Sequence, residues 1–162
     1  MTNVRPALFV LSFLSLSVPI ASHAQGRPDF SGTWSMDRSR SESAMQADPI
    51  GPTTVVITQT PTALQIATTR DGRTAAITYR LDGSPSQIPG GTATSRWEGP
   101  TLVTETVRDI QGQTVTTKEA RRLGENGSEM LVETVLVVQH GYTLKGTQNY
   151  GAGKDVFTRV RE

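Results

Sequence analysis

Apolar residues alternate with polar ones along most of this chain, and this period of two constrains the fold more than any other feature. In residues 74–81, the odd-numbered residues are apolar or aromatic and the even-numbered ones are mainly polar. The apolar set is Ala75, Ile77, Tyr79 and Leu81. A period of two is that of a β-strand with one buried face. After Gln25 no segment shows the 3.6-residue period of an amphipathic helix. The sequence therefore predicts an all-β protein.

Turn signals separate the alternating runs at short intervals. Asp71-Gly72 and Asn126-Gly127 favour the type I′ turn of a β-hairpin, because both residue types tolerate a positive φ. Further signals are Gly99-Pro100, Gln111-Gly112, His140-Gly141 and Gly151-Ala152-Gly153. The runs between them predict strands at 32–37, 53–59, 63–70, 73–81, 92–98, 101–109, 113–123, 128–139, 142–150 and 154–161. The polar stretches 38–52 and 82–91 predict loops.

Sequential strands joined by tight hairpins form an up-and-down sheet. Such a sheet tends to close on itself, because closure removes the exposed edges. We therefore predict a single antiparallel up-and-down β-barrel of about eight to ten strands. An outer-membrane barrel is disfavoured, because aromatic residues make up only 6% of the chain and cannot supply two girdles.

The first 24 residues have the three-part pattern of a secretory signal peptide. Arg5 supplies a positive charge, residues 7–20 are apolar or small, and Ser22-His23-Ala24 places small residues before a cut at Ala24–Gln25. The apolar run is shorter than the ~20 residues that span a bilayer. The sequence thus predicts a signal peptide at 1–24, one domain at 25–162, no membrane span after cleavage, and a secreted or periplasmic location.

The composition excludes several kinds of site. The chain has no cysteine, which excludes a disulfide scaffold and a lipid-anchored amino terminus. Its 16 basic residues balance 15 acidic ones and are scattered along the sequence. A nucleic-acid-binding domain normally carries a basic patch, so we expect no nucleic-acid partner.

A short motif follows the expected cleavage site. In Pro28-Asp29-Phe30-Ser31-Gly32-Thr33-Trp34, the last three residues resemble the Gly-x-Trp signature that opens the first strand of lipocalins and related calycin barrels. The segment is also similar to the Asp-Phe-x-Gly-x-Trp start of a group of bacterial exported proteins. The resemblance implies a lipocalin-like barrel in which Trp34 closes one end against an Arg of the final strand. Arg159 and Arg161 are available, and Arg159 is the better candidate because Thr158 and Val160 then share the opposite face. The Thr-Asp-Tyr-type signature and the long final helix of many lipocalins have no counterpart here.

The sequence offers little for catalysis. After signal cleavage His140 is the remaining histidine, at an expected turn, and no Cys accompanies it. We therefore predict no catalytic residue, no metal site and no cofactor, haem on His140 included. The strand glutamates leave two alternatives open: each is solvated, or one lies inside the barrel opposite an Arg such as Arg80, Arg96 or Arg108. These glutamates are Glu98, Glu105, Glu119, Glu129 and Glu133. Most strand charges are solvated.

The leading hypothesis is a non-enzymatic binding protein that holds a small apolar or amphipathic molecule inside the barrel. The predicted lining residues share an apolar parity or lie near a rim: Ile77, Tyr79, Trp97, Leu102, Val135 and Val137. A one-residue slip would exchange inner and outer faces. Residues 130–138 are apolar on both faces, which predicts that the outer face meets the loop 38–52, an envelope partner or a second copy. The alternatives are a solidly packed interaction module and a barrel enzyme, which would need two interior ionisable groups at one cavity.

Overall fold

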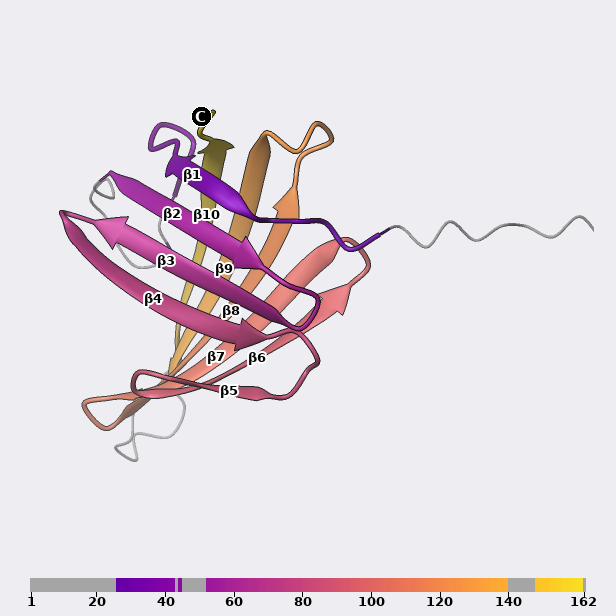
Figure 1. Cartoon of the computed structure of the whole chain (residues 1–162). Coiled ribbons are helices and arrows are strands. Elements are labelled where there is room, and N and C mark those ends of the chain that lie inside the picture. Colours follow the sequence, from indigo (N-terminus) through magenta and orange to yellow (C-terminus); the bar gives the residue numbers. More distant parts are fainter. Residues whose placement is uncertain (1–25, 43, 45–51, 140–147, 162) are drawn as a thin grey trace, which may run out of the picture.

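A computed structural model of the protein describes residues 26–42, 44, 52–139 and 148–161, with only the backbone of residues 148 and 149. Ten antiparallel strands follow one another along this part of the chain (Figure 1). They are β1 (Gly32–Met36), β2 (Thr53–Gln59), β3 (Ala63–Arg70), β4 (Arg73–Arg80), β5 (Pro85–Ile88), β6 (Gly91–Glu98), β7 (Thr101–Ile110), β8 (Gln113–Leu123), β9 (Glu129–Gln139) and β10 (Gln148–Arg159). The predicted all-β fold is confirmed.

The strands form an up-and-down barrel whose sheet is continuous between the first and last strands and has its two ends at β4 and β5. Their order is β4-β3-β2-β1-β10-β9-β8-β7-β6-β5, so consecutive strands pair everywhere except between β4 and β5, and β1 joins β10. The two outermost strands, β4 and β5, approach each other where the Arg80 amide donates to the Ser86 hydroxyl at 2.8 Å. Figure 1 shows β1–β4 crossing in front of β7–β10, with β5 at the lower edge. The predicted barrel of about eight to ten strands is thus present.

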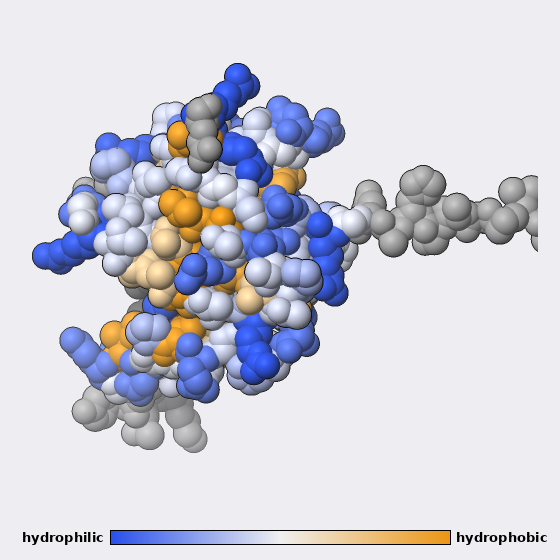
Figure 2. Space-filling model, in the orientation of Figure 1, coloured by the Kyte–Doolittle hydropathy of each residue, from blue (hydrophilic) through white to orange (hydrophobic). Residues whose placement is uncertain are grey.

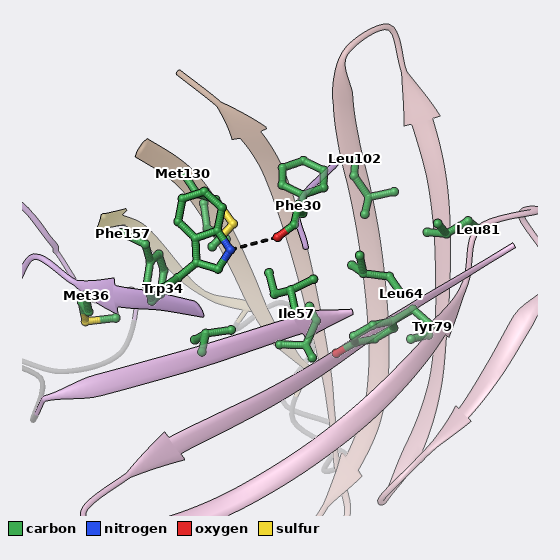
Figure 3. Packing of buried hydrophobic residues seen from close by; sticks show 14 of the residues in the cluster. Phe30, Trp34, Met36, Ile57, Leu64, Tyr79, Leu81, Leu102, Met130 and Phe157 are labelled. Atoms are coloured by element: carbon green, nitrogen blue, oxygen red, sulfur yellow. Dashed lines mark hydrogen bonds between the residues drawn. The ribbon is translucent and has the colours of Figure 1, made fainter. Parts of the chain in front are cut away.

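The alternation of the sequence becomes the two faces of the barrel wall. In β2 every second residue is buried, and in β4 Tyr79 is buried while Thr78 and Arg80 are exposed. Leu64, Leu102 and the ring of Trp34 are fully buried in the interior (Figure 3). Figure 2 shows the β1–β4 side of the exterior, where apolar surface is broken into patches by hydrophilic side chains.

The Gly-x-Trp motif packs against the final strand. Trp34 pairs in register with Arg159, whose guanidinium carbon lies 4.3 Å from the centre of the indole ring. The indole Nε1 donates to the Phe30 carbonyl at 2.9 Å (Figure 3). Gly32 has φ +131°, and a Cβ there would come within 2.6 Å of the Arg159 guanidinium. The motif needs glycine because the arginine side chain crosses that position.

Two predictions about elements were wrong. The stretch 82–91, expected to be a loop, contains the four-residue strand β5. The expected turn Gly151-Ala152-Gly153 lies inside the continuous strand β10, where a Cβ on Gly151 or Gly153 would overlap the backbone of Glu42 or Ala44. Because these glycines have no side chain, the backbone of Glu42 and Ala44 can pack against β10 at this point. Of the predicted strand 142–150, residues 148–150 belong to β10, and residues 142–147 lie outside the described ranges.

Several sequence predictions concern residues outside the described ranges. The signal peptide at 1–24, the turn at His140 and most of the loop 38–52 belong to this group. Within the described ranges no helix is both long and apolar enough to cross a membrane.

Candidate functional site: a charged cavity inside the barrel

The inner faces of six strands enclose a cavity of about 160 Å³. We call it the interior cavity. One part of its lining is apolar and consists of Met36, Val55, Ile66, Met130, Val132 and Phe157. The other part is polar and consists of Thr53, Thr68, Arg70, Glu119, Arg121 and Asp155. A cavity with an apolar and a polar wall can orient a molecule that has an apolar and a polar end.

Arg121 is the most buried charge in this lining, with 8% of its side chain exposed. Its register neighbours on β7 and β9 are the apolar Leu102 and Val132. The Nη2 atom donates to Glu119 Oε2 at 3.1 Å. The Nε and Nη1 atoms are buried and have no hydrogen-bond partner among the described residues. A buried donor without a partner costs about 1–3 kcal/mol. A ligand that brought a hydrogen-bond acceptor to this guanidinium would remove that cost.

Asp155 faces the same cavity from β10. Its Oδ1 atom is buried and has no hydrogen-bond partner among the described residues. Burial raises the pKa of this carboxyl above its usual range, the nearby Glu119 carboxylate raises it further, and Arg70 opposes both. Arg70 itself is held by its Nε, which donates to the Thr53 hydroxyl at 3.2 Å. Asp155 therefore has an unused oxygen in an environment that does not favour its negative charge.

Tyr79 and a hydroxyl pair extend the polar part of the barrel interior. Burial raises the pKa of the Tyr79 hydroxyl; the charge of Glu119 adds to this shift, and those of Arg121 and Arg108 oppose it. Tyr79 therefore stays neutral at physiological pH. The fully buried hydroxyls of Ser95 and Thr104 bond to each other at 2.9 Å.

A second hollow, of about 340 Å³, lies at the end of the barrel where the N-terminal segment crosses. We call it the outer hollow; its lining is Arg27, Asp29, Gln59, Thr60, Pro61, Leu81 and Trp97. Four of these residues, Arg27, Asp29, Thr60 and Pro61, are exposed. Both Phe30 and Arg27 lie against the Trp97 ring, at 6.0 Å and 5.6 Å from its centre. The outer hollow has the larger volume, but most of its lining residues are exposed to solvent. We therefore take the interior cavity as the candidate site.

The structure places the predicted lining residues in three different environments. The buried cluster of the interior includes Tyr79 and Leu102, and Ile77 packs against it. None of these three residues lines the interior cavity itself. Trp97 is half-buried at the outer hollow. The assignment of Val135 and Val137 to the interior was wrong: Val135 is 48% exposed, and Val137 lies on the same outer face of β9. That strand is apolar on both faces, so alternation could not identify the inner one.

That outer face of β9 continues onto its neighbours. Val137 pairs in register with Thr116 on β8 and Tyr150 on β10, and Val107 on β7 pairs with Thr116. Val107 and Tyr150 are 38% and 70% exposed. Of the loop 38–52, one of the three coverings considered for this face, the described residues Glu42 and Ala44 lie against Gly151 and Gly153 of β10, and most of the rest lies outside the described residues.

The two groups that dominate the site, Arg121 and Asp155, were not among the predicted site residues. One signal could have found Arg121: Arg121 and Arg122 are consecutive, and consecutive strand residues point to opposite faces. Arg122 binds Glu133 on the exposed outer face, at 3.0 Å. Of the glutamates whose placement was left open, Glu119 lines the cavity, and its partner is Arg121 rather than Arg80, Arg96 or Arg108.

Metal-ligating residues do not gather in the described part of the chain. Those ranges contain no group of three or more His, Cys, Asp or Glu residues arranged to hold a metal ion.

Comparison with known proteins gives the architecture a precedent. No family model and no curated protein matches the sequence. Among solved structures, human cRBP IV superposes with a TM-score of 0.56 at 16% identity, over 82% of this chain and 99% of that one. The fluorescent protein UnaG gives 0.54 at 15% identity, over 81% and 97%. Fatty-acid-binding protein 1 of Echinococcus granulosus gives 0.53 at 14%, over 82% and 98%. The chain has the fold of these small barrels. At this level of identity the likeness concerns the fold.

Proposed function

We propose that the protein is an exported, non-enzymatic binding protein that holds one small amphipathic molecule in the interior cavity. The observation that carries this proposal is the unsatisfied guanidinium of Arg121 in a cavity whose opposite wall is apolar. The ligand's polar end lies at Arg121 and accepts hydrogen bonds from Nε and Nη1. Its apolar part packs against Val55, Ile66 and Phe157.

The energetics favour a ligand over an empty, purely structural interior. A buried ion pair seldom adds stability compared with apolar residues of similar size. The pair formed by Arg121 and Glu119 leaves two guanidinium nitrogens without acceptors, which adds a further cost. A ligand that accepts hydrogen bonds from these two nitrogens removes this cost, and the free energy recovered favours binding. The fold neighbours include a fatty acid transporter and a fatty-acid-binding protein by name, which is consistent with a barrel that holds a ligand.

Native mass spectrometry of the protein purified from its own host tests this proposal. We expect a bound small molecule that is present in the wild type and absent from the variant Val55→Phe, in which a larger ring fills the cavity. Val56→Phe is the matched control, because Val56 is the adjacent residue and is 46% exposed on the outer face. Absence of any bound mass from the wild type, or equal occupancy in the two variants, would contradict the proposal.

Export is a separate part of the proposal and is supported by the sequence pattern of residues 1–24. We expect the mature protein to begin at Gln25, and amino-terminal sequencing of the exported protein checks this. A protein recovered with residues 1–24 intact would refute export by cleavage.

A barrel enzyme is the second candidate, and one observation favours it: Glu119, Arg121 and Asp155 are ionisable groups at a single cavity. Asp155, with its raised pKa, has the character of a general acid. NMR of the natural ligand after incubation with the protein separates the two functions. A binding protein returns the ligand unchanged, whereas an enzyme converts it.

A further inference from the structure

We propose that the ligand of the interior cavity is a short α-amino or α-hydroxy acid with an apolar side chain, held by its acid group on Arg121 and by its amino or hydroxyl group on Asp155. This inference rests on the proposed function and names the chemical class of its ligand.

The charges of the lining provide the first step. Two arginines, Arg70 and Arg121, face two carboxylates, Glu119 and Asp155, around the same space. A simple carboxylic acid would add a third negative charge beside Glu119 and Asp155, and a simple amine would add a positive one beside Arg121. Buried charge without a partner is costly. An amino acid adds no net charge to this balanced lining, because its amine compensates its acid. A hydroxy acid adds one negative charge, but its hydroxyl donates a hydrogen bond to Asp155.

The unpartnered atoms provide the second step. Arg121 offers two free donors, Nε and Nη1, and Asp155 offers a free acceptor, Oδ1. Arg121 pairs with Val132, and Val132 pairs with Asp155. The two residues are therefore two strands apart, with about 10 Å between their Cα atoms. Both residues line the interior cavity on either side of Val132, so we infer that one ligand over Val132 meets both with polar groups on neighbouring carbons.

The size of the cavity provides the third step. A cavity of about 160 Å³ is close to the engineered cavity of about 150 Å³ that binds benzene. It admits a ligand of roughly six to ten non-hydrogen atoms. The apolar wall at Val55, Ile66 and Phe157 then receives a short side chain of a few carbons. A long fatty-acid chain exceeds this space.

The experiment compares four probes that share one branched tail, by isothermal titration calorimetry on the mature protein. Leucine carries an acid and an amine, leucic acid an acid and a hydroxyl, isocaproic acid only the acid, and isoamylamine only the amine. We expect leucine or leucic acid to bind at least about tenfold more tightly than both single-group probes, since each charge-assisted hydrogen bond contributes about 1.5–3 kcal/mol.

The variant Asp155→Asn provides a readout that a purely structural role would not produce. We expect the affinity for leucine to fall about tenfold or more, and the affinity for isocaproic acid to stay constant or rise, because one repelling carboxylate is removed. Asp71→Asn is the matched control: it makes the same chemical change at an exposed hairpin tip with φ 50°, which Asn tolerates well.

Two results overturn the inference, and they differ from failure of the proposed function. If isocaproic acid binds as tightly as leucine and leucic acid, or if Asp155→Asn shifts all probes equally, the cavity binds a ligand but not one of this class. If no probe binds while native mass spectrometry shows a bound mass of another chemistry, the inference again fails and the binding function stands. If neither a probe nor a host molecule binds, both are wrong. The wild-type comparison remains decisive even if Asp155→Asn does not fold.

Discussion

The arginines Arg159 and Arg121 are both partly or fully buried in this barrel, and their surroundings differ. Arg159, on the final strand, donates from Nη1 to the Ser31 carbonyl and from Nε to the Gly127 carbonyl, and stacks on Trp34. Arg121, in the interior cavity, has one ionic partner, Glu119, and two nitrogens without acceptors. The first guanidinium has two backbone acceptors and no buried nitrogen without a partner among the described residues. The second is left incomplete, which distinguishes a residue that holds the fold together from one that is available to a ligand.

The largest effect is expected at Arg159. Replacing it with Leu removes the cation–π contact and leaves the carbonyls of Ser31 and Gly127 without this donor. We expect the free energy of unfolding to fall by about 3 kcal/mol, measured by urea denaturation. Arg161→Leu, two residues later on the exposed end of the chain, should change it by less than about 0.5 kcal/mol. Equal effects of the two substitutions would remove the distinction between the arginines.

At Arg121 we expect a smaller effect on stability and a complete loss of ligand binding. The double variant Arg121→Met, Glu119→Gln replaces a buried ion pair with neutral groups of similar length. We expect its free energy of unfolding to stay within about 1 kcal/mol of the wild type or to increase, since such pairs seldom stabilise. Native mass spectrometry should find the bound molecule lost. A loss of stability as large as that of Arg159→Leu would show that Arg121 too is structural.

The smallest effect is expected at Asp155 in the absence of ligand and depends on pH. Its pKa in the folded state is raised, so the fold loses stability as the pH rises from the unfolded pKa to the folded pKa, and the loss is complete above the folded pKa. Asp155→Asn should therefore be more stable than the wild type at pH 7, by no more than about 1 kcal/mol because solvent still screens this partly buried group. The gain should vanish below the unfolded pKa of about 3.9. Thermal unfolding across this pH range measures it; a gain that grows on acidification would reverse the assigned sign.

The barrel could be predicted from the sequence because its turns and strands depend on residues that are adjacent in the chain. The Asp71-Gly72 and Gln111-Gly112 turns have the paired positive φ values that a type I′ hairpin requires. The strands beside them have the predicted bounds or differ by about one residue. In contrast, β5 was missed because four residues that begin with Pro85 are too short to show a period. Gly151 and Gly153 resembled a turn because the reason for them, the backbone of Glu42 and Ala44, is more than a hundred residues away.

The site was harder to predict than the fold. The strand β8 is polar on both faces, so alternation gave no inner face on which to place Arg121. The strand β9 is apolar on both faces, and Val135 was placed inside for that reason. Burial of a charge depends on the assembled barrel rather than on the residue's own strand. Trp34 with Arg159 is the exception, because the resemblance implied an Arg of the final strand as the partner of Trp34 and alternation favoured Arg159 over Arg161.

The pairing of β1 with β10 also has a consequence for the order of events during synthesis. Trp34 and Arg159 are neighbours in the barrel but are separated by more than a hundred residues of the chain. Contacts between such distant residues form slowly, since the intervening chain must first be ordered. A nascent chain that lacks β10 therefore cannot form the contact between Trp34 and Arg159, however long it waits.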